Sequence, residues 1–265
     1  MHFIGAAHHS GPFLSFNDST MTSQTTRRLL LINPNTSAST TDRLTRILTP
    51  LLPSDWRMDA HTARFGGSYI ACEASHAVAA HAALEVWAEQ LNAGGQRPDA
   101  VLLACFGDPG LWALRESSAC PVTGLAEASF IEAAALGPFA IVTGGVRWRP
   151  MLERLAQALG FGDHLRHIET VAPSGAELLA DPDMALRCLH QACMNAARPG
   201  VRAIILGGAG LAGYAQVLQE RVDLPLIDSA QAGLRVLLKG LAPPPVSDEN
   251  RFHAQWSNVR LNLVA

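Results

Sequence analysis

Cys105 stands where a thiol could transfer a proton. It ends a short apolar run, residues 99–104, and is followed closely by Asp108 and Pro109. Asp and Pro are typical of the cap and the first turn of a helix, so we expect a helix to begin at Asp108. The amides and dipole of such a helix would favour a thiolate, which acts as an acid–base group or a nucleophile. Alternatively, Cys105 is a small buried apolar residue at a strand end.

A second strand and turn repeat this pattern without the thiol. The apolar run 201–207 leads into Gly208. Cys105 lies 16 residues before Pro121, and Gly208 lies 17 residues before Pro225, so the spacing repeats as well as the pattern. The repeat suggests two related halves with a catalytic pair of which one member is missing. The other four cysteines stand in helix-like or strand-start segments and are interpreted as structural: Cys72, Cys120, Cys188 and Cys193.

A polar loop after the first apolar run offers groups that could hold a carboxylate or an imide. It carries Asn33, Asn35, Thr36 and Ser37 directly before a helix predicted over 38–49. Side-chain amides, hydroxyls and the free N–H groups of a helix start are suited to such ligands. An ordinary capped turn between a strand and a helix has the same composition, so this alternative stays open.

The glycines of the second turn also fit a nucleotide-binding pattern. Gly208, Gly210 and Gly213 form a G-x-G-x-x-G run after a strand, and Asp228 follows 20 residues after Gly208. A dinucleotide-binding unit continues with further strands after the acidic residue. Here one helix, predicted over 229–240, and a proline-rich segment remain. We therefore expect no nicotinamide cofactor.

Composition and charge point to a compact protein that acts on a small molecule. The 265 residues are 48% hydrophobic and 16% charged, with a net charge of −3. This balance, without a Lys/Arg run or a long apolar run, argues against nucleic-acid and membrane partners. The odd number of cysteines predicts a reduced, cytoplasmic protein. His76 and His81 are five residues apart, which does not fit the spacing of two zinc ligands on a helix. The oligomeric state stays open, a homo-oligomer included.

The candidate residues lie at the ends of strand-like segments. Strand-like and helix-like segments alternate from Arg28 to about Gly240, which predicts parallel βα units. In open α/β sheets, ligands bind at the carboxyl ends of the strands. We therefore predict an α/β fold of two pseudo-symmetric lobes, each a roughly four-stranded parallel sheet with flanking helices, with the active-site cleft between them. The predicted strands are 28–33, 57–62, 99–104, 121–124, 139–143, 166–171, 202–207 and 225–228.

The two ends of the chain differ in composition from the rest. Residues 1–26 are rich in His, Ser, Thr and Gly, include a second Met at Met21, and are predicted to be a disordered extension. The segment 242–265 begins with a proline run and shows little periodicity, so we expect a C-terminal arm on the surface.

Three motifs in combination resemble the hydantoin racemase branch of the Asp/Glu racemase superfamily. They are Leu30-Leu31-Ile32-Asn33-Pro34-Asn35-Thr36-Ser37, Ala104-Cys105-Phe106-Gly107-Asp108-Pro109-Gly110-Leu111 and Leu206-Gly207-Gly208-Ala209-Gly210-Leu211. The resemblance covers about residues 28–240. It implies a cofactor-independent enzyme of two pseudo-symmetric α/β lobes, with one cysteine from each lobe on opposite faces of the substrate carbon. One thiolate removes the Cα proton and the other thiol returns a proton from the far side.

The resemblance also assigns roles to individual residues. Cys105 would be the first-lobe acid–base group, acting at Cα of a hydantoin, an amino acid or a related small acid. The loop from Asn33 to Ser37 would help to hold the substrate, and Thr143 matches the corresponding loop of the second lobe. The other substrate-binding positions are Phe106, Gly208 and Ala209, and the last strand end of the family is matched by Asp228 and Ser229.

The resemblance further implies an exchange of strands between the lobes. The strand 121–124 would join the second lobe, and 225–228 would return to the lobe of Asn33. The first lobe would then comprise residues 27–118 and 223–241, and the second would comprise 119–222.

Gly208 departs from the family pattern, because glycine has no group that titrates. A racemase needs proton transfer on both faces of the substrate carbon, within hydrogen-bond reach. Water, Tyr69 or Tyr214 could serve the empty face. The alternatives are a single-cysteine lyase that resembles arylmalonate decarboxylase, and a non-catalytic homologue that binds a small molecule in the same cleft.

Overall fold

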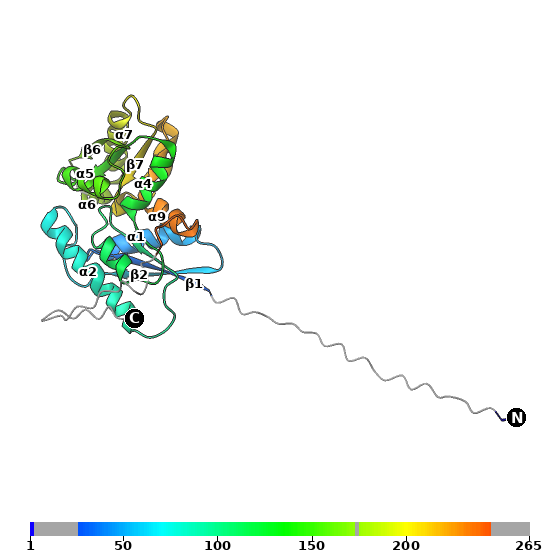
Figure 1. The fold of residues 1–265 in the computed structure, drawn as a ribbon. Helices are drawn as coiled ribbons and strands as arrows, with labels where there is room; N and C mark the ends of the chain where they lie inside the picture. Colours follow the sequence, from blue (N-terminus) through cyan, green and yellow to red (C-terminus); the bar gives the residue numbers. More distant parts are fainter. Residues whose placement is uncertain (3–25, 173–174, 245–265) are drawn as a thin grey trace.

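Two parallel β-sheets organise the chain. The computed structural model describes residues 1–2, 26–172 and 175–244. The sheets lie in two lobes, one above the other (Figure 1). Each of the predicted strands is present and agrees with the prediction to within one residue at either end. Most of the predicted N-terminal extension and C-terminal arm, 1–26 and 242–265, lies outside the described residues.

The first sheet carries the Asn33 and Cys105 loops. Its parallel strands are β1 (Arg27–Asn33), β2 (Trp56–Thr62), β3 (Ala100–Leu103) and β4 (Val122–Gly124), in the order β2-β1-β3-β4. The apolar strands β1 and β3 are buried along almost their whole length, as central parallel strands are. Because Ile32 pairs with Leu103, the two loops leave the same edge of the sheet.

The second sheet repeats the order of the first. Its parallel strands are β5 (Phe139–Gly144), β6 (Leu165–Val171), β7 (Ala203–Gly207) and β8 (Leu226–Asp228), in the order β6-β5-β7-β8. Thr143 pairs with Gly207, which brings the end of β5 beside the Gly208 turn. The predicted two-lobed α/β fold is thereby confirmed.

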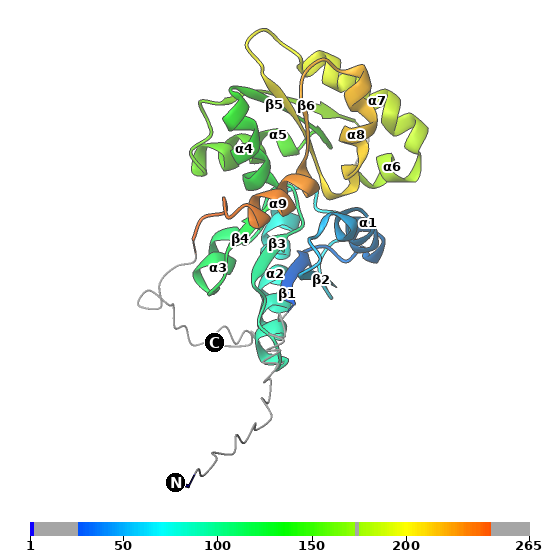
Figure 2. The same ribbon diagram turned by 90° about the vertical axis from the view of Figure 1, so that its right-hand side faces the viewer.

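The lobes exchange helices and not strands. β4 pairs with β3 and β8 pairs with β7, so the predicted exchange of 121–124 and 225–228 is wrong. Instead α4 (Leu125–Leu136) packs on β7, and α9 (Ser229–Leu238) packs on β3 and β4. Figure 2 shows α4 in the lobe of β5 and α9 at the junction of the lobes. A strand reached through one short helix pairs most readily with its predecessor, whereas a helix needs only an apolar face on which to pack.

The predicted lobe boundaries move accordingly. The chain passes from the first lobe to the second after Gly124 and returns after Asp228, later by about one strand than the predicted divisions at 118/119 and 222/223. The two exchanged helices also pack against each other. There Gly233 of α9 lies directly over Leu102, and an added Cβ would sit 2.6 Å from a methyl of that leucine.

The remaining helices cover the sheets. Ser37 caps the first of them by accepting a hydrogen bond from the Thr40 amide at 3.3 Å. Within the described ranges no helix combines the length and the apolar composition needed to cross a bilayer. The helices are α1 (Ala38–Leu48), α2 (Glu73–Asn92), α3 (Leu111–Glu116), α5 (Trp148–Ala158), α6 (Gly175–Ala180), α7 (Pro182–Ala196) and α8 (Tyr214–Leu218), with short 3₁₀ turns at Thr49–Leu51, Ala209–Leu211 and Gln219–Arg221.

One apolar core joins the inner faces of both sheets. Successive residues of β1 point to opposite faces, so Leu31 enters this shared core while Ile32 enters a separate cluster with α2 and α3. Phe130 of α4 stacks on Phe139 of β5 in the shared core, with 5.5 Å between the ring centroids. Because this core contains residues of both sheets, packing couples the two lobes and fixes the space between their strand ends.

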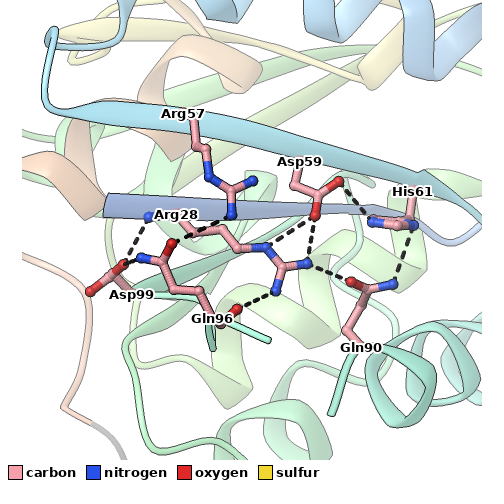
Figure 3. A network of polar contacts seen from close by, with 7 residues as sticks. All are labelled: Arg28, Arg57, Asp59, His61, Gln90, Gln96 and Asp99. Atoms are coloured by element: carbon pink, nitrogen blue, oxygen red, sulfur yellow. Dashed lines mark hydrogen bonds and ion pairs between the residues drawn. The ribbon is translucent and has the colours of Figure 1, made fainter. Parts of the chain in front are cut away.

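A buried arginine joins β1, β2 and α2 at the end of the first sheet opposite to the Cys105 loop (Figure 3). Arg28 is 7% exposed and donates to the Asp59 carboxylate, the Gln90 side-chain oxygen and the Gln96 carbonyl oxygen. The second carboxylate oxygen of Asp59 lies 3.0 Å from His61 Nε2. Burial alone would raise the Asp59 pKa, but the hydrogen bond from Arg28 and the charges of His61 and Arg28 hold it below its usual value.

Candidate active site

A cavity of about 190 Å³ lies between the lobes at the carboxyl ends of the strands. The loops after β1, β2 and β3 of the first lobe and after β5 and β7 of the second lobe line it. This is where an open α/β sheet binds ligands. The predicted site residues that line it are Asn35, Ser37, Cys105, Phe106, Thr143, Gly208 and Ala209.

Cys105 lies in the cavity wall and is 7% exposed. The residue before it continues the sheet, because the Ala104 amide donates to the Ile32 carbonyl at 2.8 Å. Phe106 inserts between the lobes, since a Cβ on Gly207 of β7 would overlap its ring. A Cβ on Gly107 would likewise overlap the ring of Trp148. Close packing of these two rings on glycines therefore helps to fix the loop that carries the thiol.

The Cys105 thiol does not receive the help from a helix that the sequence predicts. The next helix, α3, begins only at Leu111 and has Gly110 as its N-cap. Burial raises the pKa of the Cys105 thiol, and the nearby negative charge of Asp108 raises it further. The predicted preference for the thiolate is therefore wrong, because these surroundings favour the neutral thiol.

Asp108 caps a different helix from the one predicted. Its carboxylate accepts hydrogen bonds from the amides of Ala126 at 3.0 Å and Glu127 at 2.8 Å, in the first turn of α4. Gly124 leaves the space that this carboxylate fills, because a Cβ there would overlap it. Burial raises the pKa of Asp108 to about 7 despite these hydrogen bonds. Asp108 thus ties the Cys105 loop to the helix that crosses between the lobes.

We expect Asp108→Asn to increase the reactivity of Cys105. Above a pH of about 7 the Asp108 carboxylate is ionised and opposes formation of the thiolate, whereas asparagine is neutral. A fall of one unit in the thiol pKa raises the thiolate fraction about tenfold when the thiol is mostly protonated. The measurement is the rate of Cys105 alkylation by iodoacetamide at pH 8, read by peptide mass spectrometry.

Asp228→Asn is the matched control for that variant. Asp228 caps α9 by accepting from the amides of Ala230 and Gln231, and it also accepts from the Gly213 amide. It is a buried helix-capping carboxylate like Asp108, but its charge is not among those that raise the pKa of Cys105. Equal alkylation rates in the two variants would show that loosening of the lobes, and not charge, governs the thiol.

Gly208, where the motifs predict that a second cysteine is missing, has a backbone conformation that favours glycine. Its φ angle is +146°, and its amide donates to the Ser229 hydroxyl at 3.1 Å. The Cys105 amide instead donates to the Leu103 carbonyl at 3.0 Å, so the two turns differ in their hydrogen bonding. L side chains rarely adopt a φ of this sign and size. The turn is therefore built around glycine, and Ser229 belongs to its support.

We expect Gly208→Cys to destabilise the fold by about 1–3 kcal/mol, because a side chain at this φ is strained. We expect the added thiol not to raise the activity, because the backbone at residue 208 must change its conformation before the thiol can point at the substrate. Chemical denaturation and an activity assay measure both effects. Gly208→Ala is the control, since it carries the same backbone strain without a thiol. A cysteine variant of unchanged stability and raised activity would contradict this description of the turn.

The polar loop after β1 divides into a supporting part and a cavity-facing part. Asn33 is fully buried beneath the loop, where its side-chain amide donates to the Asn35 side chain, the Ser37 carbonyl and the Thr41 hydroxyl. Thr36 donates its amide to the Gly67 carbonyl at 3.1 Å. Neither Asn33 nor Thr36 lines the cavity. Asn33 shapes the loop, and Asn35 and Ser37 present groups to the cavity.

The second lobe contributes mainly backbone and apolar surface to the cavity. Thr143 lines the cavity, but its hydroxyl donates to the Gly207 carbonyl at 2.7 Å. Ala209 follows Gly208 in a short 3₁₀ turn.

On the first-lobe side, His76 braces the Cys105 loop. Its Nε2 lies 2.8 Å from the Gly107 carbonyl, which only accepts, so His76 is the donor there. Among the described residues no group of His, Cys, Asp and Glu could hold a metal ion.

Several cavity residues are not indicated by the motifs. They come from the start of α1, from the loop after β2 and from the first turn of α5: Ser39, Thr40, Ser68, Ile70 and Trp148. The loop after β2 leaves the same sheet edge as the Asn33 loop, so topology alone could have indicated it. Of the two tyrosines considered for the empty face, Tyr69 lines the cavity. Tyr214 does not, and its ring lies 5.3 Å from the Arg43 guanidinium.

The two-lobed α/β fold, with a cysteine in the wall of the cavity between its sheets, agrees with the isomerase of the racemase type that the motifs predict, and the comparisons with known proteins show this class. Residues 29–237 match the model of the Asp/Glu/Hydantoin racemase family. The chain therefore belongs to this family, as its motifs predict.

Individual relatives place the chain more closely. It is 33% identical over 213 residues to the hydantoin racemase of Paenarthrobacter aurescens, an alignment that covers 79% of this chain and 89% of that protein. It is 32% identical over 211 residues to the hydantoin racemase of Rhizobium meliloti, covering 78% and 85% of the two chains. The solved structure of an allantoin racemase from Klebsiella pneumoniae superposes with a TM-score of 0.81 at 28% identity, covering 90% and 99% of the chains. Arylmalonate decarboxylase, at 19% identity and a TM-score of 0.55, shares the fold.

Proposed function

We propose that this protein racemises a neutral five-membered cyclic ureide, such as a 5-substituted hydantoin or allantoin, and that Cys105 moves the Cα proton. The named activities of its relatives, hydantoin racemase and allantoin racemase, support the reaction class. The observation that carries the proposal is the lining of the cavity. Cys105 is its one thiol among the described residues, and Asp, Glu, His, Lys and Arg are absent from the described lining.

This lining favours a neutral ring over a free amino acid. A free amino acid would bring a carboxylate and an ammonium group into the cavity, and a buried charge is costly without a partner charge. A hydantoin ring carries carbonyl and N–H groups, which the hydroxyls of Ser37, Ser68 and Thr40 could bond. Asn35 uses its side-chain oxygen within the loop, accepting from Asn33 and the Ser37 amide, so its NH₂ group is the end that can serve the ring.

The raised pKa of the Cys105 thiol suits a weakly acidic C–H bond. A thiolate with a raised pKa is a stronger base, although less of it is present at neutral pH. In the proposed step the thiolate takes the proton from Cα, and the electron pair of the C–H bond moves into the adjacent ring carbonyl to give an enolate. Return of the same proton restores the starting enantiomer. A proton delivered to the opposite face gives the mirror image.

Polarimetry on an enantiopure panel tests the proposal. The panel contains 5-substituted hydantoins, allantoin, aspartate and glutamate, and blanks without protein correct for spontaneous racemisation. We expect the optical rotation of at least one ring compound to decay to zero while the rotations of aspartate and glutamate persist. Racemisation of the free amino acids alone would overturn the substrate class. Release of carbon dioxide from an arylmalonate without racemisation would overturn the reaction class.

A further inference from the structure

The cavity has a second side chain that could act as a proton donor besides Cys105. Among the described lining residues, the only other side chain of a type used in general acid–base catalysis is the phenol of Tyr69. The serine and threonine hydroxyls of the lining are far weaker acids. A racemase needs a proton donor on each face of the carbon, and Gly208 supplies none.

The phenol of Tyr69 is held by the lobe opposite to Cys105. Tyr69 belongs to the loop after β2 of the first lobe, but its hydroxyl donates to the Gly144 carbonyl at the end of β5, at 3.1 Å. Thr143, the residue before Gly144, pairs with Gly207 on the neighbouring strand β7. The hydroxyl is thus anchored beside the strand that leads into Gly208. Cys105 and Tyr69 both belong to loops of the first sheet, but the Tyr69 hydroxyl is hydrogen-bonded to the second.

The loop that carries Tyr69 is fixed on both sides. Upstream, the Gly67 carbonyl accepts from the Thr36 amide at 3.1 Å. Downstream, the amides of Ala71 and Cys72 donate to the Ser75 hydroxyl at 2.9 and 3.0 Å, which joins the loop to the start of α2. Ile70 between these contacts is buried. The ring is therefore presented by a braced segment, which is what proton transfer over a short distance requires.

We propose that Tyr69 is the proton donor and acceptor on the face that Gly208 leaves empty; this rests on the proposed function. When the Cys105 thiolate takes the Cα proton, the phenol gives its proton to the opposite face of the enolate and becomes a phenolate. In the reverse direction the phenolate takes the Cα proton and the Cys105 thiol returns one. Exchange of protons with water then restores the starting form, so the steps balance without a cofactor.

Tyr69→Phe separates this role from a structural one. The variant keeps the ring and removes only the hydroxyl. We expect the rate of racemisation to fall at least about 10²-fold, the usual scale for loss of an acid–base group. On long incubation in heavy water we expect the variant still to incorporate deuterium at Cα of one enantiomer with its configuration retained, because the Cys105 thiol can exchange the proton it has taken for a deuteron from solvent and return that deuteron to its own face. If the Tyr69 hydroxyl made only a structural contact, its loss would reduce deuterium exchange at Cα and racemisation together.

Tyr214→Phe is the matched control, because Tyr214 is buried outside the cavity, and we expect it to racemise and exchange like the wild type. Wild-type racemisation by Tyr69→Phe would overturn the role of Tyr69 while leaving the proposed function standing. Loss of exchange and inversion together by Tyr69→Phe would also overturn it, in favour of a structural role. A wild-type protein that neither exchanges nor racemises any panel compound would overturn the proposed function itself, and this role with it.

Discussion

Cys105→Ser is expected to lower the rate of racemisation by at least about 10³-fold. The substitution exchanges one side-chain atom, sulfur for oxygen, so the shape of the cavity changes little. A serine hydroxyl is a far weaker acid than a thiol, and its alkoxide is not populated at any pH the fold tolerates. The loss lies within the range of about 10²–10⁴ that general acid–base groups supply. Polarimetry with the best substrate of the panel measures it.

Cys72→Ser is the control for this variant, because Cys72 is also a thiol and follows the cavity residue Ile70 by two positions. It caps α2, and hydrogen bonds from the Ser75 hydroxyl and from the amides of Ser75 and Ala74 lower its pKa. Cys72 does not line the cavity, and serine is a good N-cap, so we expect activity and stability to be kept. If Cys72→Ser were inactive and Cys105→Ser active, the base would be Cys72, and our assignment of the proton transfer to Cys105 would be wrong.

Arg28→Ala is expected to destabilise the protein by about 2–3 kcal/mol. The substitution leaves the Asp59 carboxylate, the Gln90 side chain and the Gln96 carbonyl without their shared donor, and Arg28 is buried. The loss of stability in such variants comes mainly from the polar partners that are left without a hydrogen bond, and less from the lost attraction itself. The partial exposure of Asp59 keeps the loss below that of a fully buried pair. For a chain of this size the melting temperature should fall by roughly 5–10 °C.

Arg57→Ala is the matched control on the neighbouring strand. Arg57 is exposed and makes a long contact of 3.5 Å with the Gln96 side chain, so its loss should change stability by less than about 0.5 kcal/mol. Thermal unfolding of both variants beside the wild type provides the comparison. Equal melting temperatures for Arg28→Ala and the wild type would mean that water replaces the arginine at little cost.

The strands could be predicted from the sequence because their signal is local. Runs such as 99–104 and 202–207 are apolar along almost their whole length and end in glycine or polar residues, which identifies buried parallel strands. Such runs could not predict which segments pack on the opposite lobe. Whether α4 or β4 crosses depends on which apolar faces meet in three dimensions, and the sequence around Gly124 carries no sign of that choice.

Asp108 shows why local helix signals failed at the site. The pair Asp108-Pro109 has the composition of a helix start, but its carboxylate reaches the amides of Ala126 and Glu127, far along the chain. The same long-range contact places a negative charge near Cys105 and raises its pKa, which reverses the predicted preference for the thiolate. Position at a strand end was sufficient to place Cys105 in the cavity wall, whereas its protonation depends on tertiary burial.

The cavity lining could be predicted only in part for a similar reason. Motifs identified Asn35, Ser37 and Cys105 because they follow strands directly. Asn33 carries the same chemical groups, yet the alternation of the strand turns its side chain into the interior. Trp148 belongs to α5 and reaches the cavity by packing against Gly107, a contact that no spacing reveals.

The most direct test of the central claim follows deuterium during the first turnovers of the wild-type protein. One enantiomer of the best ring substrate is incubated in heavy water, and Cα deuterium is measured separately in the product and in the remaining substrate. A thiol carries a single proton, so a proton removed by Cys105 returns to its own face while the opposite face receives its proton from a group in exchange with solvent. We therefore expect the product to carry deuterium at Cα while the remaining substrate still carries protium. A product that keeps the original proton would contradict the account.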